Sequence, residues 1–291
     1  MRIVYASDLH GNTSHYDELL GLASSEHAQA LVLGGDLLPS PHGLSSPAGR
    51  ADSHERQLGY LLSELLPRLE MLQINAVGVF LLLGNYDMGS VAGPFEAECA
   101  SRGFLTLHDQ VRESQGEFFA GLTSVNFTPF PLKDWETYDL EEGDVGAGAA
   151  DQHDPRAVFT VERADGFVPL AATLERLGRK VPSRAGEATY VLHAPPHGCG
   201  LDLVSRRDPP VGSRAVRRFI ETAQPRLTLH GHIHESPHLS GRWAARLGQT
   251  LAIQPGQAVD RLHAVVVDTL HPLETARHTI FGPLDPQQLG S

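Results

Sequence analysis

Seven side chains that can bind metal ions follow short apolar runs of the sequence. They occur in the stretches "SDLH", "GGD", "GN", "VLH" and "HGHIH", as Asp8, His10, Asp36, Asn85, His193, His232 and His234. Three oxygen donors and four imidazoles suit Mn, Fe, Co or Zn better than Ca or Mg, which prefer oxygen ligands alone. A single catalytic ion that keeps an open position cannot use seven protein ligands, whereas two ions that share a carboxylate can. The set therefore predicts a two-metal site.

The apolar runs before these residues predict buried strands, which would position the ligands. The first three runs end on Asp8, Asp36 and Asn85 and cover residues 2–8, 30–36 and 76–85. Helical patterns separate them, and such alternation predicts a mostly parallel sheet that is covered on both faces. Ligands of such sheets bind beyond the carboxyl ends of the strands. The polar residues stand at those ends.

The rest of the chain is less regular. We expect helices from a cap at Ser14, from about His54 to Leu72 with an interruption near Pro67, near 168–179, and from Ser213 to about Ala223. We expect further strands within 104–127, 188–198, 226–236, 250–257 and 262–270. Residues 39–53, rich in Pro, Gly and Ser, predict a loop. The acidic, glycine-rich tract at 133–166 predicts either a mobile surface insertion or a lid over the substrate.

Charge and composition exclude several classes of protein. Thirty-five acidic residues against 23 basic ones give a formal charge of −12, so the chain lacks the basic face that holds extended nucleic acid. The best apolar run, at 76–84, is far shorter than the roughly 18 residues needed to span a membrane. The first residues contain no signal-peptide core, and two cysteines, Cys99 and Cys199, imply no disulfide framework. We expect a cytoplasmic protein without a membrane partner.

The order of the motifs D-x-H, GD, GN, H and GHxH resembles that of the calcineurin-like metallophosphoesterases. The resemblance covers residues 1 to about 263, with 39–57 and 131–187 unmatched. It implies an α/β fold, namely a four-layer α-β-β-α sandwich with two central mixed sheets and a metal site at the strand carboxyl ends. It also implies one metallophosphoesterase domain over residues 1–291, with insertions at 39–57 and 131–187. The downstream stretches "HAPPHG", "VGSRAV" and "GHIHES" are similar to a bacterial and eukaryotic branch that acts on phosphodiesters or nucleotides.

The resemblance also implies a role for each ligand. The seven residues divide between two ions that share Asp36: Asp8, His10 and His234 hold the first ion, and Asn85, His193 and His232 the second. We expect two divalent ions, manganese first among them, with iron, cobalt, zinc or nickel as substitutes. The family chemistry is in-line attack on phosphorus by a hydroxide that bridges the two ions.

Departures from the family pattern narrow the range of expected activities and substrates. Protein serine/threonine phosphatases have Asp-Arg-Gly after GD and His-Glu after GN, whereas this chain has "GGDLLPS" and "GNYD". Pro39 stands in place of the tyrosine ligand of purple acid phosphatases. Typical phosphomonoesterases have, at the position of Tyr86, a histidine oriented by the next acid, here Asp87. A phenol, with a usual pKa of about 10, is a weaker acid than imidazolium, so we expect substrates with good leaving groups. Alternatively, Tyr86 only packs against the rim of the site.

Asn85, Tyr86, Asp87 and His197 are the candidate catalytic residues. His197 is a candidate substitute acid or phosphate contact, or else an exposed loop residue. Tyr86, His197 and Arg214 are the candidates for substrate binding, because an arginine fork matches phosphate oxygens. Arg214 could equally lie on a solvated face.

Together these features predict a metal-dependent phosphoester hydrolase, and more specifically a phosphodiesterase that acts on small nucleotide-like or cyclic phosphodiesters. Two alternatives stay open: a phosphomonoesterase or nucleotidase of the same fold, and a non-catalytic metal-binding interaction module. The expected partner is a small phosphorylated substrate and not extended nucleic acid. The sequence leaves open whether the chain forms a homo-oligomer.

Overall fold

The first sheet contains the strands that the sequence places before Asp8, Asp36 and Asn85. A computed structural model describes the chain except residues 74–76, 147–148, 164–165, 183–184, 286–288 and 290–291. The strands β1 (Arg2–Ala6), β2 (Ala30–Gly34) and β3 (Gly78–Leu82) pair in parallel. The sheet order is β15-β14-β13-β1-β2-β3-β4, with β4 (Leu105–Thr106), β13 (Val265–Asp268), β14 (Arg277–His278) and β15 (Gly282–Pro283). The sheet is mixed because β13 runs antiparallel to β1. Ala76, within the third expected strand, lies outside the described residues.

The second sheet collects the later strands in the order β11-β12-β10-β9-β6-β5. Its bounds are β5 (Gln110–Ser114), β6 (Glu117–Leu122), β9 (Thr189–Leu192), β10 (Leu227–Leu229), β11 (Ala244–Leu247) and β12 (Thr250–Ile253). The central strands are parallel, whereas β5 and β11 pair antiparallel with their neighbours. A separate pair joins β7 (Val125–Asn126) to β8 (Glu136–Thr137).

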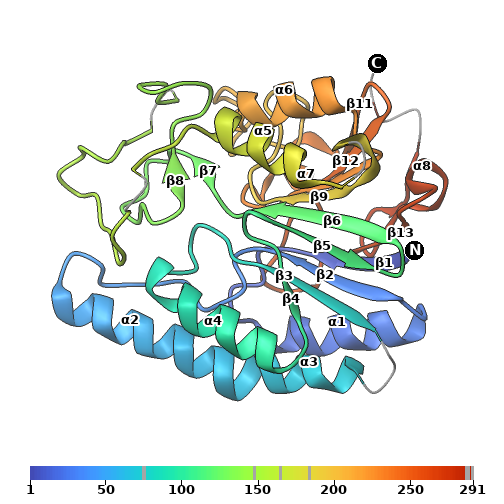
Figure 1. Cartoon of the computed structure of the whole chain (residues 1–291), viewed down its shortest axis with the longest axis horizontal. Helices are drawn as coiled ribbons and strands as arrows, with labels where there is room; N and C mark the ends of the chain where they lie inside the picture. Colours follow the sequence, from blue (N-terminus) through green and yellow to red (C-terminus); the bar gives the residue numbers. More distant parts are fainter. Residues whose placement is uncertain (74–76, 147–148, 164–165, 183–184, 286–288, 290–291) are drawn as a thin grey trace.

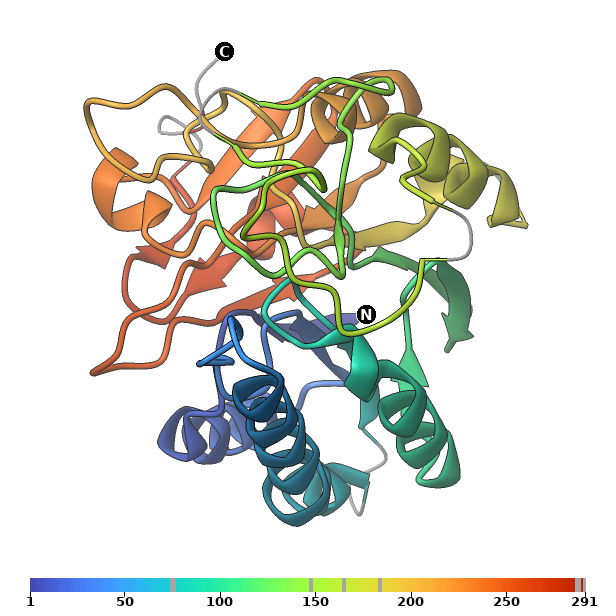
Figure 2. The same cartoon turned by 90° about the vertical axis from the view of Figure 1, so that its left-hand side faces the viewer.

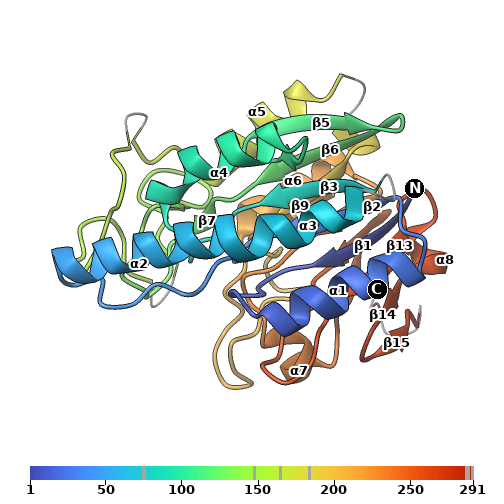
Figure 3. The same ribbon diagram turned by 90° about the horizontal axis from the view of Figure 1, so that it is seen from below.

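Side chains alternate along the strands, so that each sheet has two buried faces. On β1, Val4 packs with the helices that cover the first sheet, whereas Ile3 and Tyr5 join Phe119 and Val191 in the layer between the sheets. The far face of the second sheet is covered by a third apolar cluster from two helices. Figure 1 shows this order of layers, and Figure 3 views the molecule from the side of the helices that cover the first sheet. The four-layer α-β-β-α sandwich expected from the sequence is confirmed.

Helices form the two outer layers. The first sheet is covered by α1 (Thr13–Ser25), α2 (Pro47–Tyr60), a π-helical turn (Leu61–Leu65), α3 (Leu66–Gln73) and α4 (Gly89–Ser101). The second sheet is covered by α5 (Leu170–Lys180) and α6 (Arg214–Ala223). Shorter elements are a 3-10 turn (Ala185–Glu187), α7 (Ser236–Ser240) and α8 (Pro272–Thr275). None of the described helices is both long and apolar enough to cross a membrane.

Two expectations about helix boundaries are wrong, and one is confirmed. The first helix begins at Thr13 with Asn12 as its cap, not Ser14, because the Asn12 side chain accepts from the His15 backbone N–H. Residues 47–53, expected in a loop, form the start of α2, where the Ser46 hydroxyl caps the Gly49 N–H at 3.0 Å. The interruption expected near Pro67 is present as the π-helical turn, which separates α2 from α3 and ends two residues before Pro67. That local change of winding accommodates a residue without an N–H.

The carboxyl ends of the parallel strands meet at one end of the molecule. Strand β1 runs from the N-terminus, at the right of Figure 1, to the left, where the loops between β7 and α5 lie. Figure 2 shows this end facing the viewer, with those loops over it. The start of the acidic tract at 133–166 is anchored, because Lys133, Asp134 and Asp139 are buried.

Candidate metal centre

Tight turns after the strands place the seven expected ligands. Four of them have backbone φ angles in the left-handed region, namely Asp8 at 58°, His10 at 45°, Asp36 at 52° and His232 at 70°. Such conformations are costly for residues other than glycine and persist only where surrounding contacts enforce them. Here the backbone N–H of Asp8 donates to the Gly35 carbonyl, and that of His10 to the Asp36 carbonyl, both at 2.9 Å. The turns after β1 and β2 therefore hold each other.

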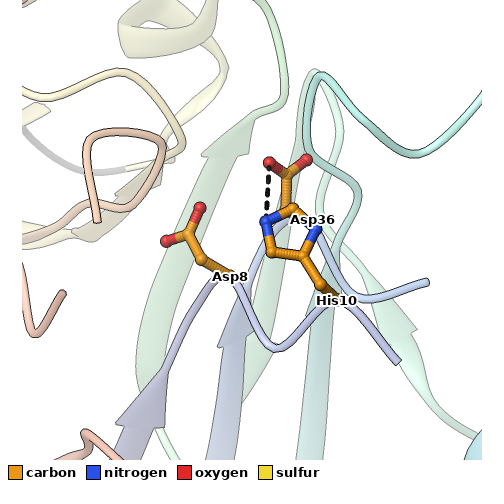
Figure 4. A group of neighbouring side chains, drawn as sticks. All are labelled: Asp8, His10 and Asp36. Atoms are coloured by element: carbon orange, nitrogen blue, oxygen red, sulfur yellow. Dashed lines mark ion pairs between the residues drawn. The ribbon is translucent and has the colours of Figure 1, made fainter. Parts of the chain in front are cut away.

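Asp8, His10 and Asp36 form the first group of ligands. One ligand atom from each lies within 4.8 Å of the others, and Figure 4 shows the three side chains gathered at the ends of β1 and β2. The His10 Nε2 to Asp36 Oδ2 distance is 3.8 Å. The His234 ring lies beside that of His10, with 6.0 Å between centroids. These four residues are the set expected for the first ion.

Asn85, His193 and His232 form the second group. The Asn85 Oδ1 atom lies 3.1 Å from His193 Nε2 and 2.7 Å from His232 Nδ1. Asp36 borders this group as well, because its Oδ2 atom is 3.6 Å from His193 Nε2. Its carboxylate therefore lies between the two groups, where a bridging ligand must be.

Backbone contacts orient these ligands toward the centre. His193 Nδ1 lies 2.9 Å from the Gly34 carbonyl, a contact that directs Nε2 to the centre, where it would be the metal-binding nitrogen. Asp8 accepts from the His232 N–H at 2.9 Å, and Asp36 from the Tyr86 N–H at 2.8 Å. Gly84 makes room for this packing, because a Cβ there would lie 2.2 Å from Asp36 Oδ1.

The buried charges of the site call for a cation. Asp8 and Asp36 are 1% and 2% exposed, and burial raises the pKa of Asp8. Burial also opposes ionisation of Asp36, yet the charge of His193 lowers its pKa well below the usual range. Burial lowers the pKa of His193, but the Asp36 charge outweighs it and raises the value to about 9. Burial lowers the pKa of His232 to about 3, so its imidazole is neutral at pH 7 and can bind a metal ion through one nitrogen. Divalent ions would supply the positive charge that two buried carboxylates need, and the donors fit them.

The motifs that hold this centre are those of one family. A model of the calcineurin-like phosphoesterases matches residues 1–236. The chain belongs to this family. It is therefore a metallophosphoesterase.

Solved structures agree with the fold of this calcineurin-like phosphoesterase. One crystal structure matches 97% of this chain and 99% of its own, with 15% identity and a TM-score of 0.63. The structure of TT1561 from Thermus thermophilus matches 96% of this chain and 98% of its own, with 14% identity and a TM-score of 0.58. At such identities the likeness shows the fold alone. A search of proteins with curated functions finds no match.

Tyr86 lies at the edge of the metal centre in this phosphoesterase. Its half-buried ring meets the His10 ring edge-on, with 5.7 Å between centroids. Burial, and after it the charge of Asp36, raises the pKa of Tyr86 to about 12. The phenol is therefore neutral at pH 7 and adjoins an expected ligand of the first ion.

Asp87 makes different contacts from those of an acid-orienting residue. In the described part of the chain its carboxylate accepts from backbone N–H groups, those of Leu37 at 3.1 Å, Leu38 at 2.8 Å and Gly84 at 2.8 Å. These contacts tie the turn after β2 to the turn after β3. We therefore propose that Asp87 positions the backbone around Asp36 and Asn85, in place of the direct catalytic role expected from the sequence.

The two remaining candidate residues, His197 and Arg214, belong to the part of the chain that forms the second sheet and its helices. His197 Nδ1 is 3.7 Å from Asp202 Oδ2, in the loop after β9. Arg214, at the start of α6, lies 3.6 Å from Asp139 Oδ2 and also pairs with Asp144. Because these carboxylates already pair with the charge of Arg214, the geometry favours a structural role for its side chain over the expected contact with substrate.

Sequence reasoning missed three residues that support the site. Gln57 of α2 is buried and donates to the Pro39 and Tyr86 carbonyls, both at 2.9 Å. Trp135 Nε1 donates to the Asp87 carbonyl at 2.6 Å. Phe130 contacts the Tyr86 ring, with 5.6 Å between centroids. The residues lie in or beside stretches read as insertions, and no local pattern marks their distant partners.

Proposed function

We propose that this chain is a dinuclear, metal-dependent phosphodiesterase that acts on small nucleotide-like or cyclic phosphodiesters. The observation that carries the proposal is the position of Asp36, which lies 3.8 Å from His10 Nε2 and 3.6 Å from His193 Nε2 and so adjoins both ligand groups. When bound, two divalent ions polarise phosphoryl oxygens and lower the pKa of water for in-line attack. The chain's part is to fix the ligands around the positions of the ions.

Manganese is the proposed native ion, with iron, cobalt, zinc or nickel as substitutes. The mixed carboxylate, amide and imidazole donors support this group of metals over Ca and Mg. We also propose a single domain over residues 1–291 and a cytoplasmic location. The free thiols of Cys99 and Cys199 support a reducing compartment, and cell fractionation would test it.

The properties of Tyr86 support diesters over monoesters as the substrates of this chain. A neutral phenol beside the ion site adds no positive charge to bind the second negative charge of a monoester. With its pKa raised to about 12, Tyr86 is also a poor proton donor to a leaving oxygen. The missing positive charge and the weak proton donation should slow hydrolysis least for diesters that carry one negative charge and have good leaving groups.

Replacing Tyr86 by histidine is expected to shift the preference toward monoesters. The kcat/KM ratio of p-nitrophenyl phosphate to bis(p-nitrophenyl) phosphate should rise by about tenfold or more, because imidazolium adds a positive charge that binds the second negative charge of a monoester. Tyr86→Phe is the matched control and should leave the ratio unchanged. An unchanged ratio in Tyr86→His would show that this side chain does not select the substrate.

We further propose that His197 donates the proton to the leaving oxygen, with Asp202 as its positioning residue. Asp202 is fully buried, and its Oδ2 atom accepts from the backbone N–H groups of Gly198 at 2.8 Å and Gly212 at 3.0 Å. The carboxylate is thereby fixed 3.7 Å from His197 Nδ1. The imidazole keeps a partly exposed outer edge that could meet a substrate oxygen.

The loss caused by His197→Gln should depend on the leaving group. With 2′,3′-cyclic AMP, whose leaving group is a ribose hydroxyl, kcat should fall by about 100-fold, as is typical of a lost general acid. With bis(p-nitrophenyl) phosphate the fall should be only a few-fold, since p-nitrophenolate leaves without a proton. Asp202→Asn should give the same pattern in a weaker form. Equal losses for both esters would argue against proton donation by His197.

A further inference from the structure

We propose that Phe130 and Tyr86 form an aromatic platform that binds the planar ring of the substrate, as in a nucleobase. The inference rests on the proposed function and specifies which part of the substrate the chain recognises. The platform is defined by these two side chains. It extends from the rim of the metal centre to the protein surface.

The platform is continuous with the metal centre through ring contacts. The Tyr86 ring lies 5.7 Å from the His10 ring and 5.6 Å from the Phe130 ring, with the last pair tilted at 66°. Phe130 is 46% exposed, whereas Tyr86 is half-buried. A phosphate held by the ions would therefore place its organic group beside Tyr86 and then Phe130.

The backbone around the exposed Phe130 is held in place. It stands between Pro129 and Pro131, which restrict the backbone on both sides. Its N–H donates to Thr128 Oγ1 at 3.1 Å, and the Pro131 carbonyl accepts from the Val158 N–H at 2.8 Å. A backbone that is already ordered loses little entropy when a ligand binds to a side chain that it carries.

Buried charges anchor the turn that presents Phe130. The Thr128 N–H donates to Glu136 Oε2 at 2.8 Å, and Lys133 Nζ donates to the Thr128 carbonyl at 2.7 Å. Lys133 and Glu136 pair with each other at 2.6 Å, and both side chains are fully buried. An anchored turn thus presents an exposed aromatic ring next to Tyr86.

An isolated exposed phenylalanine is common on protein surfaces, so the inference depends on the position of Phe130 and on its anchored backbone. Phe130 is tilted at 66° to Tyr86, so a flat ring would stack on the exposed Phe130 face beside the Tyr86 edge, and stacking accepts any base because every base has a π-face. The ring could be a nucleobase or an aryl leaving group. The chemistry is the same, and kinetics can separate the two.

Binding of two related phosphates tests the platform directly. AMP and ribose 5-phosphate share sugar and phosphate and differ only in the base. In titration calorimetry of the manganese-loaded protein, Phe130→Ala should weaken AMP binding by about tenfold, the usual scale of one lost stacking contact. Ribose 5-phosphate should bind the variant as it binds the wild type. Phe130→Leu, which keeps apolar surface without a flat ring, should resemble Phe130→Ala.

Phe159→Ala is the matched control for these variants. Phe159 is 37% exposed on the same segment, but its ring contacts Phe167. It should leave AMP binding unchanged. The proposal is overturned if wild-type protein binds AMP and ribose 5-phosphate equally well, or if Phe130→Ala and Phe159→Ala weaken AMP binding alike.

Kinetics then identify the ring and separate this inference from the proposed function. Thymidine 5′-(p-nitrophenyl phosphate) and ethyl p-nitrophenyl phosphate release the same leaving group, and only the first carries a base. A loss in Phe130→Ala confined to the thymidine ester places the nucleobase on the platform, whereas equal losses place the aryl group there. If neither ester is hydrolysed by the wild type, the proposed function fails, but a base-dependent change in AMP binding still supports the platform.

Discussion

Replacing Asp36 by asparagine is expected to lower kcat/KM for bis(p-nitrophenyl) phosphate by about 1,000-fold. Asparagine keeps an oxygen for the Tyr86 N–H, which now donates to Asp36 at 2.8 Å. It removes the negative charge that adjoins both ligand groups. Ions at such a centre contribute several kcal/mol to the transition state, and each 1.4 kcal/mol is about tenfold in rate.

Metal content separates this explanation from general damage to the fold. Asp36→Asn should retain fewer than two manganese ions per chain after dialysis, measured by plasma mass spectrometry. Asp139→Asn is the matched control. Asp139 is also buried, but it accepts from the Arg214 and Ala215 backbone N–H groups at the start of α6. It should retain both ions and most activity. Two bound ions and wild-type rates in Asp36→Asn would remove Asp36 from the centre.

The second large effect concerns stability. Lys133→Met is expected to lower the free energy of unfolding by about 3 kcal/mol, because it leaves the Glu136 carboxylate buried without its partner. The two side chains are fully buried and lie 2.6 Å apart. Burial already raises the pKa of Glu136 to about 7, even though Lys133 lowers it. The measurement is the midpoint of urea unfolding at pH 8, where an unpaired glutamate costs most.

Two controls make this prediction specific. The double variant Lys133→Met with Glu136→Gln removes both charges and should recover much of the loss. Arg156→Met breaks an exposed pair with Asp154 in the same segment, and the midpoint should not move. If Arg156→Met and Lys133→Met shift the midpoint equally, the buried pair does not anchor the segment.

The meeting place of the candidate ligands was the most predictable part of the molecule because its signals are local. Asp8, Asp36 and Asn85 each follow a short apolar run, and parallel strands bring their ends to one edge of a sheet. The sequence therefore indicates both the ligand types and their meeting place. The order of layers follows for the same reason, since alternation along β1 requires a buried face on each side.

Helix boundaries and inserted segments were less predictable because their signals conflict or are distant. Ser46 and Pro47 are good start signals for a helix, but they lie in a stretch whose composition is typical of a loop. In the acidic tract, Asp134 and Asp139 are buried since they accept from Gly89 and Arg214. Such partners are far away in sequence, and composition alone suggests a solvated surface.

The role of Asp87 shows the same limit within a motif. The sequence relates it to its neighbour Tyr86, whereas its carboxylate contacts Leu37 and Leu38, about fifty positions earlier. Phe130 is a similar case, because nothing in "TPFPL" indicates a ring contact with Tyr86. The spacing within a motif identifies candidate ligands at the end of a strand. It does not identify the residues of distant segments that contact those ligands or their neighbours in the fold.

Metal titration of the stripped protein tests the central claim most directly. Protein freed of metal with a chelator is titrated with Mn²⁺, while the hydrolysis of bis(p-nitrophenyl) phosphate is followed. The dinuclear account predicts no hydrolysis at the start and a rate that rises until two ions are bound per chain. Hydrolysis that persists without metal, a rate that saturates at one ion, or a failure of Mn, Fe, Co, Zn and Ni to restore any hydrolysis would contradict it.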